Sequence, residues 1–114
     1  MAQYELNPFT RVMERADAKV TIGTSVTASA TLGTADEYVP VDATSGAVVL
    51  TLLASTSKLE GKQYEISKRD SSSNTVTIDP NSSETINGAS TMIISFQYST
   101  AHIVCNGDGT WSVI

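Results

Sequence analysis

Several features that are common in catalytic and secreted domains are scarce in this chain of 114 residues. Its one cysteine, Cys105, excludes both an intramolecular disulfide and a cysteine-rich metal site. Its one histidine, His102, would have to serve any Ser-His-Asp site. The sequence has no Gly-x-Ser-x-Gly nucleophile elbow and no Gly-rich phosphate loop. We therefore expect no enzyme and no cofactor.

Long apolar runs are missing as well. A membrane-spanning helix needs about 20 mostly apolar residues, and the sequence has no such run. Its N-terminus also lacks the charged and then apolar pattern of a signal peptide. We expect no membrane segment and no secretion through a signal peptide. The single cysteine fits a protein that is assembled in a reducing cytoplasm.

Basic residues are few. Seven Lys and Arg stand against twelve Asp and Glu, which gives a net charge of −5. Residues 1–19 are charge-balanced, so the whole excess falls on the remainder of the chain. A nucleic-acid surface needs a basic patch that neutralises phosphates. The charge distribution therefore predicts no nucleic-acid partner.

What the sequence has in quantity is Ser, Thr and short alternating apolar stretches. Alternation with a period of two is typical of strands, and seven to nine such stretches follow one another at about ten-residue spacing. The sequence predicts an all-β fold, a small antiparallel sandwich or barrel with an extended or short-helical N-terminal arm. We divide it into the arm (1–18), a linker or edge strands (19–36) and a compact β module (37–114).

The stretch from Tyr64 to Asp79 shows the clearest pattern. Tyr64, Ile66 and Lys68 share one side, five small polar residues follow, and alternation resumes at Thr75. We interpret it as a β-hairpin around a polar loop. We also expect 91–98 and 101–105 to pair across the turn at 99–100. The run 47–53 is expected to be a buried strand, 38–41 an edge strand because of its proline, and 57–60 one helical turn closed by a glycine.

The arm offers a short apolar stripe. Asn7 and Pro8 can start a helix, and apolar residues then recur at helical spacing. One interpretation is a frayed end or a short helix that caps the domain's own core. The other is an anchoring arm that docks on a neighbouring subunit and becomes ordered on binding. The residues that would bind the partner are Phe9, Arg11, Val12, Met13 and Arg15.

The other residues with potential chemistry favour structural interpretations. His102 and Cys105 lie three apart, so on a strand they point to opposite faces and cannot share a metal. Four carboxylates lie near turns, but no Asp-x-Asp-x-Asp-Gly calcium loop occurs. We expect no bound metal. The four are Asp70, Asp79, Glu84 and Asp108.

Three aromatic residues could stack against a sugar if they shared an exposed face. They are Trp111, Tyr98 and Tyr64. The alternative, which we favour, is that Trp111 is buried and serves the fold.

Several short motifs resemble a β module found in bacteriophage virion proteins. They are Gly61-Lys62-x-Tyr64, Asn74-Thr75-Val76-Thr77-Ile78, Glu84-Thr85-Ile86-Asn87-Gly88 and Trp111, within a match from about Glu37 to Ile114. Modules of this kind occur in tail fibres and in capsid decoration (cement) proteins. Residues 1–36 resemble nothing that we can name.

The resemblance implies a structural protein of the virion, assembled in the host cytoplasm. We expect a decoration protein that binds the major capsid protein or other virion proteins, because an arm precedes the module and the module runs to the last residue. The resemblance also implies a homo-oligomer, in particular a homotrimer. The alternative is a tail or head fibre component that binds host glycans.

Overall fold

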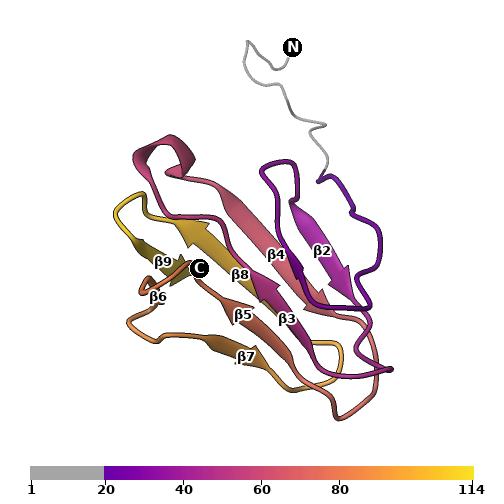
Figure 1. Ribbon diagram of the computed structural model, residues 1–114. Coiled ribbons are helices and arrows are strands. Elements are labelled where there is room, and N and C mark those ends of the chain that lie inside the picture. Colours follow the sequence, from indigo (N-terminus) through magenta and orange to yellow (C-terminus); the bar gives the residue numbers. More distant parts are fainter. Residues whose placement is uncertain (1–19) are drawn as a thin grey trace, which may run out of the picture.

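The computed structural model describes residues 20–114, which form nine short strands and one 3-10 turn (Figure 1). The elements are β1 (Ala30–Thr31), β2 (Tyr38–Val41), β3 (Val48–Thr51), η2 (Ser57–Leu59), β4 (Gln63–Lys68), β5 (Val76–Asp79), β6 (Thr85–Ile86), β7 (Met92–Ile94), β8 (Thr100–Cys105) and β9 (Thr110–Val113). The residues predicted to bind a partner through the arm lie outside the described residues.

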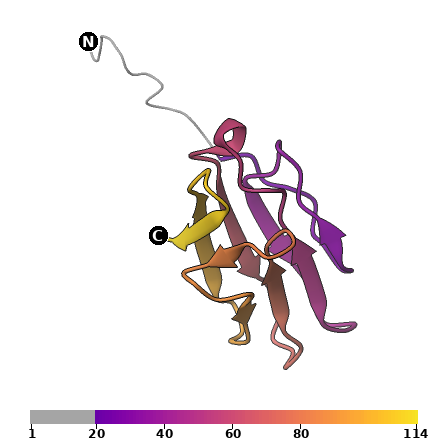
Figure 2. The same cartoon turned by 60° about the vertical axis from the view of Figure 1, so that its left-hand side comes forward.

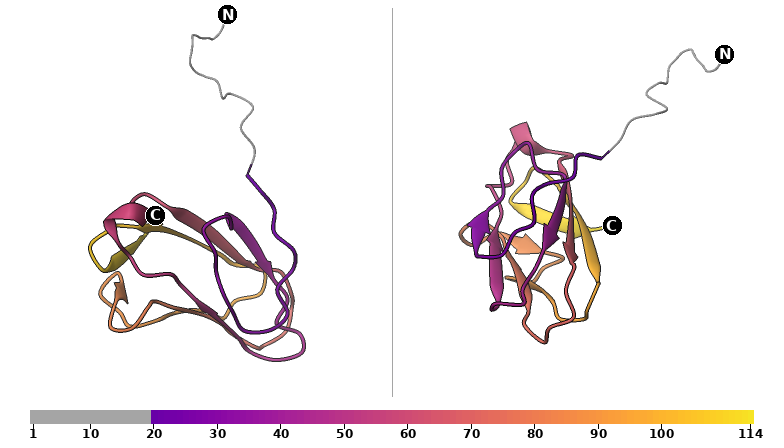
Figure 3. Two further views of the ribbon diagram at one scale, coloured as in Figure 1. Left: turned by 45° about the horizontal axis from the view of Figure 1, so that its top comes forward. Right: turned by 90° about the vertical axis from the view of Figure 1, so that its right-hand side faces the viewer.

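The strands form two sheets that face each other (Figures 2 and 3). One sheet has the order β1-β3-β5-β7, and the other has the order β2-β4-β8-β9-β6. Apolar side chains from both sheets fill one core between them. The predicted all-β sandwich with seven to nine short strands is confirmed.

The pairing within the sheets is mixed, which corrects the prediction of an antiparallel fold. Four pairs are parallel, namely β1–β3, β2–β4, β3–β5 and β6–β9, and three pairs are antiparallel. Alternation of side chains shows that a segment is a strand with one buried face, but both pairing directions give the same alternation. The sequence pattern therefore could not distinguish them.

The predicted hairpin between 64 and 79 is also wrong. Its two strands, β4 and β5, belong to different sheets, so residues 70–75 cross from one layer to the other. β4 pairs with β2 and β8, whereas β5 pairs with β3 and β7. A polar loop of this length suits a hairpin, but it can equally bridge two packed sheets, and the core then decides between them.

The predicted pairing of 91–98 with 101–105 is wrong for the same reason. β7 pairs with β5 in the first sheet, and β8 pairs with β4 and β9 in the second. Strand β7 is also shorter than expected, because only Met92–Ile94 form it. Residues 95–99 are another crossing between the layers.

Other local expectations are confirmed. β2, with Pro40, is an edge strand of the second sheet, and β3 lies inside the first sheet with Val48 and Leu50 fully buried. The helical turn forms at η2, and Gly61 follows with a φ of +88°, which suits glycine. The segment 19–36 contributes β1 at an edge.

Residues before β2 also pack on the module. Ile22 and Val26 each form a bridge to β2, and Leu32 joins the core. Packing of the sandwich therefore begins well before residue 37.

Candidate docking surfaces

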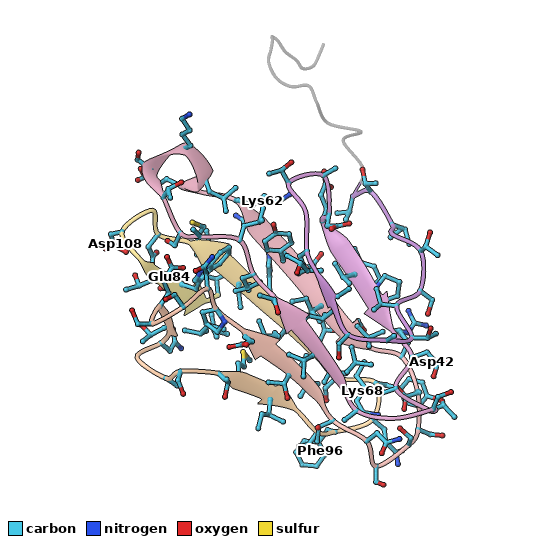
Figure 4. All side chains as sticks on the ribbon, in the orientation of Figure 1. Asp42, Lys62, Lys68, Glu84, Phe96 and Asp108 are labelled. Atoms are coloured by element: carbon cyan, nitrogen blue, oxygen red, sulfur yellow. The ribbon has the colours of Figure 1, made fainter. Side chains whose placement is uncertain are left out.

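A buried ion pair occupies the crossing between β4 and β5. Lys68, which is labelled in Figure 4, ends β4 with its side chain fully buried. Its Nζ donates to Asp70 Oδ2 at 2.7 Å. The same Nζ donates to the carbonyl oxygen of Ser72 at 2.9 Å. Asp70 Oδ1 accepts from the backbone N–H of Ala43 at 2.9 Å. The alternation placed Lys68 on the apolar face correctly, and the crossing loop supplies the counter-charge that burial of a cation requires.

These contacts determine the ionisation of Asp70. Desolvation opposes ionisation, but hydrogen bonds from Lys68, Ser72 and the backbone of Ala43 outweigh it, and the pKa of Asp70 lies well below its ordinary value of 3.8. The carboxylate is thus charged throughout the physiological range. Together with Lys68 it ties the 42–44 turn to the crossing loop.

The depressed pKa predicts a stability that depends on pH. A carboxylate of this kind contributes stability that is complete above its unfolded pKa of about 3.9 and is lost as the pH falls through the folded value. We expect the free energy of unfolding, measured by urea titration, to decline below about pH 4. Asp70→Asn should show a shallower decline over that range. An identical decline in both proteins would contradict this account.

A second polar junction joins the other end of the sandwich. The backbone N–H of Ser55 donates to both carboxylate oxygens of Glu84, at 3.0 and 3.1 Å. Ser55 Oγ donates to the carbonyl oxygen of Thr110 at 3.0 Å and accepts from the N–H of Gly107 at 3.1 Å. The thiol of Cys105 is buried and donates to Ser55 Oγ at 3.3 Å. The carboxylate of Glu84 therefore has a structural role, because it holds the backbone of Ser55.

Asn87 and Gly88 complete this junction. Both have positive φ, +49° and +82°, as the Asn-Gly pair predicts. The N–H of Asn87 donates to the carbonyl oxygen of Trp111 at 2.9 Å, and its Oδ1 accepts from the N–H of Val113 at 3.1 Å. The residues of the motif from Glu84 to Gly88 thus hold β6 against β9. These residues therefore serve the fold, and a binding surface has to be sought at other residues.

The three predicted stacking aromatics do not share an exposed face. Trp111 is 1% exposed and Tyr64 is fully buried, with their ring centroids 5.8 Å apart in the core. Tyr64 donates its hydroxyl to the carbonyl oxygen of Gly33 at 2.9 Å, and burial raises its pKa to about 12. Tyr98 is 63% exposed. The stacking surface predicted from these three residues is therefore wrong, whereas the burial of Trp111 is confirmed.

His102 and Cys105 lie on opposite sides of β8, as their spacing predicts. His102 is partly exposed on the outer face of the second sheet, with Nε2 2.9 Å from Gln63 Oε1. Within residues 20–114, no group of three or more His, Cys, Asp and Glu side chains could hold a metal ion. The carboxylates near turns are separated: Asp70 is paired with Lys68, Glu84 binds Ser55, and Asp108 accepts from Thr110.

An open hollow of about 400 Å³ lies on the outer face of the second sheet, around His102. Three of its polar side chains have partners within the chain: His102 bonds Gln63, Glu37 accepts from the N–H of Thr21 at 2.9 Å, and Lys62 Nζ lies 5.0 Å from the centre of the Tyr64 ring. The hollow is an open depression of the surface with a mostly apolar lining. Its lining residues are Val20, Glu37, Gly61, Lys62, Gln63, Glu65 and His102.

The most exposed apolar residues of the module gather at strand β7 and the loop that follows it. Ile93 is 59% exposed, Phe96 is 80% exposed, and Tyr98 is 63% exposed. Phe96 projects away from both sheets at the edge where β7 lies (Figure 4). We call Ile93, Phe96 and Tyr98 the apolar edge. Exposed apolar groups that lie together on a small protein commonly mark a contact surface.

Sequence reasoning missed the apolar edge because it assigned 91–98 to one paired strand. The signal was present, since no Asp, Glu, Lys or Arg occurs between Glu84 and Asp108. The strand was predicted to run to residue 98, whereas it ends at Ile94 and leaves Phe96 and Tyr98 outside.

No protein-family model matches the chain, and the search of curated proteins found no match. In the part of the chain that the structure describes, no helix has the length and apolar character to cross a membrane.

Proposed function

We propose that the chain is a structural protein of a bacteriophage particle, and within that class a capsid decoration (cement) protein. The observation that carries the proposal is that the residues of the resemblance and the most exposed apolar residues are different sets. The residues that resemble a virion module, such as Tyr64, Glu84 and Trp111, are engaged in holding the sandwich together. The most exposed apolar groups of residues 37–114, which form the apolar edge, are not among them.

The mechanism is adhesion. A decoration protein stabilises a shell by mass action, because it binds the assembled shell and not the dissociated subunits. The partners are the major capsid protein or other virion proteins, and the chain acts as a homo-oligomer, in particular a trimer. Its place is the virion, after assembly in the host cytoplasm. The acidic module provides no surface for nucleic acid.

The arm is the proposed anchor. Deleting residues 1–18 is expected to reduce binding to shells of the major capsid protein from the same genome by about tenfold or more, because the apolar anchors Phe9, Val12 and Met13 are lost. Co-sedimentation with the shells measures the occupancy, and circular dichroism shows whether the module stays folded.

A variant of the arm separates apolar anchoring from charge. Replacing Phe9, Val12 and Met13 together with serine should reduce binding to the shells as much as the deletion does. Arg11→Gln combined with Arg15→Gln should reduce binding less, since rim charges contribute little. Full occupancy by the deleted chain would refute the arm's role.

A fibre component that recognises host glycans is the second candidate, and one observation favours it. Tyr98 presents an exposed ring from a backbone with a φ of +59°, which is unusual for an aromatic residue. Binding on a glycan array that disappears in Tyr98→Ala, without any binding to shells, would favour recognition over decoration.

A further inference from the structure

We propose that copies of this chain bind one another along the free edge of β7 and the loop behind it, through the apolar edge of Ile93, Phe96 and Tyr98. This rests on the proposal that the protein acts as a homo-oligomer, and it assigns the surface through which the copies meet. Three observations carry it: the direction of the backbone groups of β7, the protection of the other sheet edges, and the distribution of charge.

The backbone N–H and C=O groups of Ile93 point away from the neighbouring strand β5. In the β3–β5 pair, Val48 donates to the carbonyl oxygen of Thr75 and Leu52 donates to that of Asp79. Alternate residues of β5, including Thr77, therefore turn their backbone groups toward β3, and Val76 and Ile78 turn theirs toward β7.

The antiparallel register completes this reasoning. Val76 lies opposite Ile94, and Ile78 lies opposite Met92, so these pairs exchange the hydrogen bonds. The N–H and C=O of Ile93 then face the free side. Among residues 20–114, no strand pairs with β7 on that side. The edge can thus accept a strand or loop of a neighbour.

The other three edges are short or covered. β2 is bridged by Ile22 and Val26, and it carries Pro40. β6 has two residues and is closed by a bridge from Ile86 to Ala89. β1 also has two residues. Free edges are normally protected by Lys, Pro or a bulge, and the sequence of β7, Met-Ile-Ile, has no lysine and no proline.

The apolar character continues onto the outer face of the first sheet. Ile93 lies opposite Thr77, and Thr77 lies opposite Val49, so the three form one uncharged row that ends at the free edge. Ile93 and Val49 are both exposed, whereas the inner residues of the same strands are buried. Phe96 and Tyr98 follow in the loop after β7 and are also exposed.

The charge distribution leaves one surface at which a second copy can be the partner. The module carries the whole negative excess of the chain, so two copies repel each other over most of their surfaces. The stretch between Glu84 and Asp108 is free of Asp, Glu, Lys and Arg, and it contains the apolar edge. Asp79 is the one charged residue in the strands of the first sheet, so two acidic copies can meet there with few like charges opposite one another.

The test is the mass of the full chain in solution, by light scattering across a dilution series. We expect two or three times the chain mass of 12.1 kDa. Ile93→Lys, which places a charge at the edge, should raise the dissociation constant about tenfold or more and give single chains. Ile22→Lys is the matched control, because Ile22 is 65% exposed and lies away from β7. It should keep the mass of the unaltered chain.

A second variant guards against misfolding of the first. Phe96→Ser changes a loop residue that is 80% exposed, and it should weaken association with an unchanged circular dichroism spectrum. A single-chain mass for the unaltered protein at every concentration would overturn the inference, and so would equal dissociation by Ile22→Lys and Ile93→Lys.

Binding to shells is measured separately on the same proteins. Single chains that still bind shells would remove this surface and leave decoration standing. Oligomers that dissociate in Ile93→Lys but never bind shells would leave the surface standing and remove decoration.

Discussion

Replacing Asp70 with asparagine is expected to lower the free energy of unfolding by about 3–5 kcal/mol, because it leaves a buried cation without its counter-charge. The side chain of Lys68 is fully buried, and that of Asp70 is 5% exposed. Neither can regain water without opening the crossing between the sheets. A small domain has about 5–15 kcal/mol of stability in total, so urea unfolding should show the loss clearly.

A double-mutant cycle tests whether the pair is the cause. Lys68→Met removes the cation, and in combination with Asp70→Asn it should recover part of the loss, since a neutral pair needs no counter-charge. Asp42→Asn is the matched control. Asp42 lies in the neighbouring turn and bonds Thr44, but it is solvent-accessible, and its replacement should leave the unfolding midpoint nearly unchanged. Strict additivity of the two core changes would contradict the proposed coupling.

Replacing Trp111 with alanine is expected to lower the free energy of unfolding by about 3–5 kcal/mol, as other large-to-small changes in a core do. Trp111 is 1% exposed, and its ring lies against that of Tyr64. It pairs with Cys105 across β8 and β9, next to the junction at Ser55. The cavity would therefore lie where both sheets and the C-terminal strand meet, and thermal unfolding should report it.

Trp111→Phe should lower the free energy of unfolding much less, by about 1–2 kcal/mol. The indole Nε1 is buried and has no hydrogen-bond partner among the described residues, so its removal sacrifices no hydrogen bond. Tyr98→Ala serves as the exposed aromatic control and should change stability by about 0.5 kcal/mol or less. A loss in Tyr98→Ala as large as that in Trp111→Ala would contradict the assignment of core and surface.

The sequence predicted the elements of this fold better than their partners. Period-two alternation located β4, β5 and β8 because each has one buried face, a continuous apolar run located β3, and Pro40 marked the edge strand correctly. Partner choice depends on which apolar faces meet across the core, and this is a property of the whole chain. Local turn signals at 70–74 and 99–100 therefore suggested hairpins where the chain changes sheets.

The surfaces were harder to predict than the strands. Alternation placed Lys68 on the buried face, but only the crossing loop shows that Asp70 neutralises it. The aromatic residues Tyr64, Tyr98 and Trp111 differ in burial for reasons that no spacing records, since two lie on core strands and one lies in a loop. The apolar edge became visible only when β7 was seen to end at Ile94.

Amide hydrogen exchange of the full-length chain, free and bound to capsid shells, tests the account most directly. The account holds that the sandwich core is an inert support and that adhesion takes place through the arm and the apolar edge. It predicts slower exchange on binding in residues 1–18 and 91–99, with exchange in β3 and β5 unchanged. Unaltered exchange throughout, or protection confined to the hollow around His102, would contradict it.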